Sequence, residues 1–80
     1  MSYRQRWTKA YSNQLRRLNR NHIYKIRVKK HPFTVGETKL LDYEWRIVGP
    51  EGMVEEVGRK ITPREAINEA AHRRWRRFGD

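Results

Sequence analysis

The spacing of apolar residues along this 80-residue chain changes from a helical repeat to a strand repeat and back again. A helix with one buried face repeats its apolar residues three or four positions apart, whereas a half-buried strand alternates them at every second position. The segments with these repeats are a helix over 2–20, strands over 22–30, 39–48 and 53–59, and a helix over 62–78. This order predicts a single α+β domain over residues 1–80, with the arrangement α-β-β-β-α. A three-stranded antiparallel sheet (22–59) is packed by the C-terminal helix and joined by an amphipathic, basic N-terminal helix.

The N-terminal helix is defined by one apolar stripe. Its members are Tyr3, Trp7, Tyr11, Leu15 and Leu18. We predict that the helix stops at Asn19–Asn21, because Asn tolerates the left-handed conformation found after helix ends. Its other residues are only moderate helix formers, so the helix needs its stripe packed against the rest of the protein.

The strand segments predict which side chains face the core. The inward set is Tyr24, Ile26 and Val28, then Leu41, Tyr43, Trp45 and Ile47, then Met53 and Val57. We expect His31-Pro32 to end the first strand, 33–38 to form a loop, and 49–52 to form a hairpin turn. Glu55 shares the inward parity of the third strand, which predicts a bulge near Gly58 or an edge position.

The C-terminal helix has the strongest boundary signals. Thr62 is the predicted N-cap, Pro63 takes the first helical position, and Glu65 completes a capping box. Ile61 and Ala66 occupy the positions of a hydrophobic staple, and Gly79 ends the helix. The predicted buried stripe is Ala66, Ile67, Ala70, Ala71, Trp75 and Phe78.

Charge is strongly segregated along the chain. The first thirty residues contain ten Lys or Arg and no Asp or Glu, while the whole chain has a formal net charge of +10. A positive field over one part of the surface attracts polyanions. Arg outnumbers Lys, and Arg makes bidentate contacts with phosphate. The candidate nucleic-acid-binding residues are Arg4, Arg6, Lys9, Arg16, Arg17, Arg20, Lys25, Arg27, Lys29, Lys30, Arg73 and Arg77.

Structural explanations compete with binding at each part of this set. On the first strand, Asp42 and Glu44 are available as cross-strand partners for the Lys and Arg residues. At the end of the last helix, Arg residues also favour the negative end of the helix dipole. The aromatic rings are assigned to the core, with Tyr3 and Tyr24 as the two candidates for stacking on bases.

No catalytic pattern accompanies the charge. The chain has no Cys, its three His residues lack metal-ligand spacing, and it has no glycine-rich phosphate loop. We therefore predict a protein that is not an enzyme and needs no cofactor or metal. The lack of Cys, of a signal peptide and of a long apolar run predicts a cytoplasmic or nucleoid-associated location.

Residues 43–78 resemble two related families of DNA-binding domain. Trp45-Arg46-Ile47, the turn at 49–52, Gly58, and the helix start at 62–67 followed by Ala70 are similar to the arm-binding domains of tyrosine integrases and the ethylene-response-type domains of plants. The resemblance implies that a three-stranded sheet enters the major groove and that its outward residues read DNA. The order of elements is also similar to that of double-stranded-RNA-binding domains.

Three hypotheses follow from the sequence. The favoured one is a small basic protein that binds DNA or RNA by contacting phosphates through its N-terminal helix and first strand. The alternative is a small phage-type inhibitor or adaptor that binds an acidic protein surface in a nucleic-acid machine, such as a polymerase or an immune effector complex. Binding of 2–20 to an anionic membrane ranks last, because the apolar stripe is needed for the core. The oligomeric state stays open.

Overall fold

A computed structural model describes residues 6–79 of the chain. Its elements are α1 (Lys9–Asn19), β1 (Lys25–Val35), β2 (Thr38–Val48), β3 (Val54–Lys60) and α2 (Pro63–Phe78). The strands form one antiparallel sheet in the order β1-β2-β3. The predicted α-β-β-β-α arrangement is therefore confirmed.

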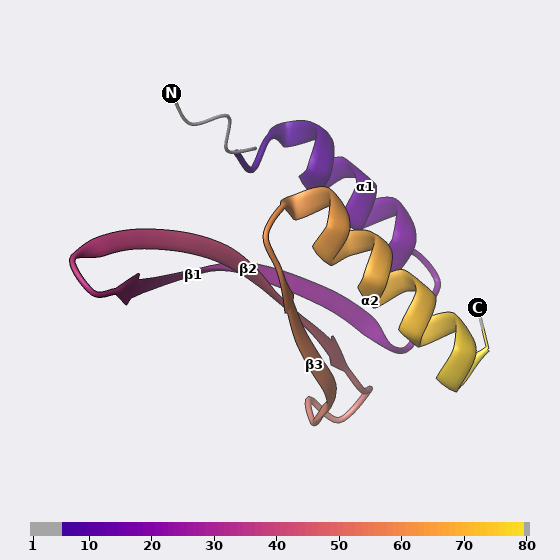
Figure 1. Ribbon diagram of the computed structural model, residues 1–80. Helices are drawn as coiled ribbons and strands as arrows, with labels where there is room; N and C mark the ends of the chain where they lie inside the picture. The colour runs from indigo at the N-terminus through magenta and orange to yellow at the C-terminus, as the bar shows by residue number, and fades with distance from the viewer. Residues whose placement is uncertain (1–5, 80) are drawn as a thin grey trace.

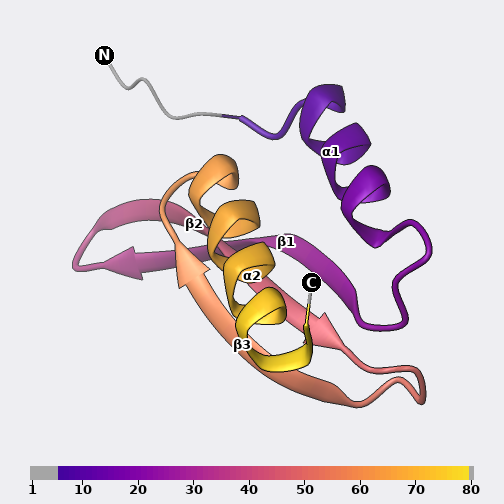
Figure 2. The ribbon, with the colours of Figure 1, turned by 90° about the vertical axis from the view of Figure 1, so that its right-hand side faces the viewer.

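Both helices lie on one face of the sheet, and the other face is uncovered (Figures 1 and 2). α2 contacts all three strands, whereas α1 contacts only β1 and α2. The core lies between the sheet and α2. Its buried apolar residues are Ile26, Tyr43, Trp45, Ile47, Ala66, Ile67 and Ala70. In the part of the chain that the structure describes, neither helix combines the length and apolar character needed to cross a membrane.

The first helix is shorter than the predicted span of 2–20. Residues 6–8 are not helical, and Thr8 stands at the N-cap in an extended conformation. The predicted members Tyr3 and Arg4 lie outside the described residues. The predicted stop is confirmed, because α1 ends at Asn19 and Asn21 adopts a left-handed φ of 59°.

β1 is longer than predicted, because Pro32 does not end it. The strand continues to Val35, and a two-residue turn at Gly36-Glu37 replaces the expected loop at 33–38. Gly36 has a φ of 62°, as the first central position of a type II′ hairpin turn requires. The β1–β2 hairpin thus extends beyond β3, whose pairing with β2 begins at Tyr43 (Figure 1).

The position of Pro32 in the ladder explains why β1 tolerates it. The N–H and C=O of Ile26 bond to the side chain of Asn19, so they point away from β2. In an antiparallel ladder this direction recurs at every second residue, and Pro32 has the same parity as Ile26. The missing N–H of Pro32 therefore faces the free edge of the sheet, where no ladder bond is lost.

The prediction that Met53 and Val57 face the core is wrong. Val57 is exposed, because a register shift between Ile47 and Val48 changes the parity of the strand beyond it. Met53 is exposed as well, and it lies before the first residue of β3. Gly58 faces the core instead, beneath the ring of Trp45. For Glu55 the sequence predicted either an edge position or a bulge near Gly58. β3 is an edge strand, which confirms the first alternative. The register shift in β3 lies next to Glu55 rather than near Gly58.

The predicted N-cap of α2 is confirmed, and Glu65 of the predicted capping box bonds to the hydroxyl of Thr62. The Glu65 N–H donates to the Thr62 hydroxyl at 3.2 Å, and that hydroxyl donates to the Glu65 carboxylate at 3.0 Å. Gly79 ends the helix with a φ of 73°. The predicted staple does not form, because Ile61 is exposed.

The buried stripe of α2 contains an arginine where a tryptophan was predicted. Trp75 is 61% exposed, and Arg74 is only 4% exposed. Arg74 follows the buried Ala70 by four residues, so it continues the inner face of the helix, whereas Trp75 lies one step around the helix. Tyr24 is also held inside, because its ring stacks on Phe78 with centroids 3.9 Å apart.

The guanidinium of Arg74 fastens α1 and the start of β1 to α2. It donates to the Leu18 carbonyl at 2.6 Å, to the Tyr24 carbonyl at 2.9 Å and to the Asn19 side-chain oxygen at 3.2 Å. The Leu18 carbonyl belongs to the last turn of α1, where the helix dipole favours a cation. Arg74 therefore positions α1 on the sheet.

We expect Arg74→Met to lower the free energy of unfolding by about 1–3 kcal/mol, because it leaves buried carbonyl oxygens without a donor. Urea denaturation measures this change. The exposed Arg76→Met, two residues along the same helix, is the matched control and should have little effect. Equal stability of the two variants would contradict the role of Arg74.

We expect Gly58→Ala to destabilise the fold by about 1–3 kcal/mol through overpacking. A Cβ at Gly58 would lie 2.5 Å from the Trp45 ring, which is held by a 2.9 Å bond from its N–H to Glu69. The midpoint of urea denaturation should fall in Gly58→Ala and stay nearly unchanged in Val57→Ala, at the adjacent exposed position. An unchanged midpoint in Gly58→Ala would show that the ring moves aside freely.

Candidate functional site

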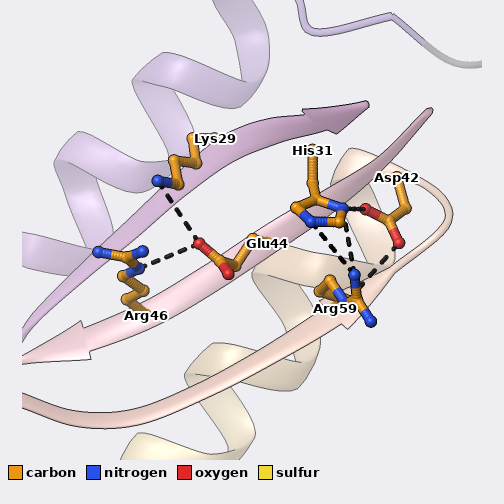
Figure 3. Close-up of polar contacts among 6 residues, drawn as sticks. All are labelled: Lys29, His31, Asp42, Glu44, Arg46 and Arg59. Carbon is orange, nitrogen blue, oxygen red and sulfur yellow. Dashed lines mark hydrogen bonds and ion pairs between the residues drawn. The ribbon is translucent and has the colours of Figure 1, made fainter. Parts of the chain in front are cut away.

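The carboxylates of β2 are neutralised on the uncovered face of the sheet (Figure 3). Glu44 pairs with Lys29 at 3.7 Å and with Arg46 at 3.0 Å. Asp42 lies 3.0 Å from His31 and 4.0 Å from Arg59. These contacts cross all three strands. The cross-strand pairing considered for the first strand is therefore present, but only Lys29 among its candidate residues takes part.

A second set of ion pairs joins β3 to α2. Arg73 contacts Glu56 at 2.7 Å, and Arg77 lies 3.9 Å from Glu56 and 4.0 Å from Glu55. Arg77 also donates to the Glu55 carbonyl at 2.9 Å. Arg73 and Arg77 thus lie over β3, at the edge of the sheet opposite β1.

The cations of α1 and β1 form a different kind of surface. We call it the α1–β1 basic surface. Its members are Arg6, Lys9, Arg16, Arg17, Arg20, Arg27 and Lys30, all exposed. Within residues 6–79, none of them forms an ion pair. Lys25 is half-buried, and its ammonium donates to the Asn19 carbonyl at 2.8 Å. Positive charge on this side of the molecule is left without a neighbouring carboxylate.

A groove runs between α1 and β1, and we call it the α1–β1 groove. It consists of two hollows, with volumes of about 650 Å³ and 330 Å³, that share Trp7 and Val28 in their walls. The larger lies between α1 and β1, and the smaller lies beyond the start of α1, between Trp7 and the strands β1 and β2. Arg16, Arg20, Lys25 and Arg27 line the larger hollow, and Lys29 and Lys30 line the smaller. The described residues that line the groove include no Asp or Glu.

Aromatic and aliphatic side chains line the groove between these cations. The Trp7 ring lies 6.4 Å from the Tyr43 ring and 5.6 Å from the Tyr11 ring, centroid to centroid. Its N–H donates to the Ser12 hydroxyl at 2.7 Å, which fixes the orientation of the indole. Leu15, Ile26 and Val28 complete the apolar lining.

Asn19 sets the distance between the two walls of the groove. Its side-chain oxygen accepts from the Ile26 N–H at 2.8 Å, and its side-chain nitrogen donates to the Ile26 carbonyl at 3.0 Å. The amide group thus takes the place of a neighbouring strand at this point of β1. Val28 and Lys30 lie two and four residues after Ile26 in the same strand. Their backbone N–H and C=O groups therefore also point away from β2, toward the groove.

The structure brings about half of the predicted nucleic-acid-binding residues together at the groove and places the others elsewhere. Arg16, Arg20, Lys25, Arg27, Lys29 and Lys30 come together at the groove. Arg6, Lys9 and Arg17 lie outside its lining, Arg73 and Arg77 lie at the opposite edge, and Arg4 lies outside the described residues. The predicted packing of Trp7 on the core is confirmed, but sequence reasoning did not foresee that Trp7 also lines a groove. It assigned Asn19 to a helix stop alone and missed its bonds to β1. A bond from Asn19 to a backbone seven residues later leaves no periodic signal.

Metal ligation finds no support in residues 6–79, where no group of three or more His, Asp or Glu side chains is arranged to hold an ion. In comparisons with known proteins, the sequence matches no protein-family model, no curated protein and no solved structure. The resemblances to DNA- and RNA-binding domains therefore stay predictions.

We expect Asn19→Ala to destabilise the protein by about 1–3 kcal/mol, because it leaves the backbone of the buried Ile26 unpaired. Amide hydrogen exchange should become faster at Ile26. Asn13→Ala, at a half-buried position of α1, is the matched control. Unchanged exchange at Ile26 in Asn19→Ala would contradict the bridging role of this side chain.

Proposed function

We propose that this protein binds nucleic acid and contacts phosphates through α1 and β1. One observation carries the proposal: the α1–β1 basic surface lacks carboxylate partners, although six carboxylates elsewhere in residues 6–79 have local partners. These carboxylates are Asp42, Glu44, Glu55, Glu56, Glu65 and Glu69. An unneutralised surface of this kind concentrates polyanions and releases their counterions on binding.

The chemistry of the cations favours phosphate. Five of the seven residues of the α1–β1 basic surface lie on or next to α1, and four of these five are Arg, namely Arg6, Arg16, Arg17 and Arg20. Guanidinium groups form paired hydrogen bonds with phosphate oxygens. Two of them, Arg16 and Arg17, lie in the last turn of α1, where they also favour the helix dipole. Dipole compensation alone leaves Arg27 and Lys30 on β1 unexplained.

Arg73 and Arg77 contribute less to the proposed site. Each is engaged by carboxylates of β3, so a phosphate would have to displace an existing partner. Both side chains are about half exposed, and surface ion pairs of this type are weak. They therefore add a general positive field rather than a primary contact.

Salt dependence tests the proposal. We expect the affinity for DNA or RNA to fall steeply with salt, and the double variant Arg16→Ala with Arg20→Ala to make the log–log slope shallower by about 1.4 to 1.8. The double variant Arg64→Ala with Arg76→Ala removes the same charge from exposed positions of α2 and serves as the control. Binding measured by fluorescence anisotropy at several salt concentrations provides the slopes.

Two results would overturn the proposal. A slope near zero for the unmodified protein would exclude phosphate contacts, and an equal change of slope in the α2 control would exclude α1 as their source. Failure to bind any polynucleotide would favour the alternative partner, an acidic protein surface of a nucleic-acid machine.

A further inference from the structure

We infer that the α1–β1 groove holds one single strand of nucleic acid, with its phosphates on the flanking cations and a base against Trp7. This inference rests on the proposed function and specifies the form of the nucleic acid. Four features of the groove support it: its charge, its aromatic lining, the edge of β1 and its size.

The cations of the groove are arranged along its length. Arg16 and Arg20 line it from α1, Lys25 and Arg27 from the first half of β1, and Lys30 from farther along the strand. Lys29 also lines it, but its ammonium is paired with Glu44, so it is not among the phosphate contacts. A row of positive charge with no carboxylate in the lining can contact successive phosphates of a linear chain. A compact anion needs only one point of this row, so an extended polyanion fits it better.

The apolar lining lies between the cations, where the bases of such a strand would lie. Trp7 is half-buried, so part of its indole is open to a ligand, and its N–H is already bonded to Ser12. An indole held in this way offers its ring face more than its polar edge. Stacking of bases on aromatic side chains inside a basic groove is the general mode of single-strand binding.

The edge of β1 adds backbone donors and acceptors. The sheet order leaves β1 at the edge, and Asn19 covers only the backbone groups of Ile26 there. Val28 lines both hollows and has the parity of Ile26, so its N–H and C=O face the groove. The edges of an unpaired base carry donors and acceptors that match such groups.

The size of the groove separates a single strand from a duplex. Its two hollows fall within or near the range of about 300–1,000 Å³ that is usual for small-molecule sites, which suits individual nucleotides. The bases of a duplex are paired and stacked, so they cannot reach Trp7 without unpairing. A duplex would instead contact the outer face of α1, where Arg17 lies outside the groove lining.

Neighbouring arginines on α1 provide a matched test. Arg16 lines the groove and Arg17 does not, although both are exposed and both are on the last turn of α1. At about 0.15 M salt, we expect Arg16→Ala to weaken binding of oligothymidine or oligouridine of about ten nucleotides by about tenfold. Arg17→Ala should weaken it by about twofold or less. Equal losses, or a larger loss for Arg17→Ala, would overturn the assignment to the groove.

Tryptophan fluorescence provides a second test that does not depend on the charges. Trp45 is 1% exposed, so quenching by an oligonucleotide must come from Trp7 or the exposed Trp75. We expect quenching to persist in Trp75→Phe and to disappear in Trp7→Phe. The affinity should fall by about fivefold or more in Trp7→Leu, provided that its circular dichroism is unchanged. Quenching that follows Trp75 instead would place the base contact on α2 and overturn the inference.

A duplex of the same length separates this inference from the proposed function. Tighter binding of the single strand, with a loss in Trp7→Leu confined to it, supports the groove. Equal or tighter binding of the duplex, with no effect of Trp7→Leu, would overturn the inference and leave phosphate binding through α1 intact. Binding of neither form would overturn both.

Discussion

The docking of α1 and of the start of β1 on α2 depends on one buried cation, the guanidinium of Arg74. α1 has no fully buried residue, although Leu15 and Leu18 of its apolar stripe pack against the core. Arg74 reaches from the inner face of α2, near the end of the helix, to the carbonyls of Leu18 and Tyr24. The side-chain oxygen of Asn19 accepts a further hydrogen bond from Arg74 and one from the N–H of Ile26, so Asn19 links Arg74 to β1. Because these bonds meet at the connection between α1 and β1, they also set the shape of the groove between the two elements.

The division of charge follows from the same architecture. β2 is the central strand, so its carboxylates on the uncovered face have basic neighbours on both sides, and β3 meets the basic end of α2. α1 lies on the covered side of the sheet, away from the uncovered face on which Asp42 and Glu44 are paired (Figures 1 and 3). The fold thus neutralises one part of the molecule internally and leaves the cations of the α1–β1 basic surface without ion pairs among the described residues.

The sequence predicted those elements whose signals are local. The capping box at Thr62 and Glu65, the alternation from Leu41 to Ile47 and the turn at 49–52 each depend on residues close in the chain. The errors occurred where a distant element decides the outcome. Arg74 can be buried because carbonyl oxygens about fifty residues away accept hydrogen bonds from its guanidinium. Pro32 continues a strand because β1 is at the edge. Trp7 packs against the core as predicted, but its second role, in the lining of the groove, depends on how α1 docks beside β1. The acid-free charge of the first thirty residues indicated the basic surface, but only the docking of α1 divides that surface into groove and outer face.

The position of Pro32 also bears on self-association. An edge strand with a continuous row of free N–H groups is a template on which a second chain can add a strand, and this is a common route to aggregation. In β1 the row is interrupted at two positions: the side-chain amide of Asn19 bonds to the backbone of Ile26, and Pro32 has no N–H. The intervening backbone faces the groove, where α1 and a row of like charges stand beside it. Like charge and these two interruptions both disfavour the addition of a second copy of the chain as a strand at this edge.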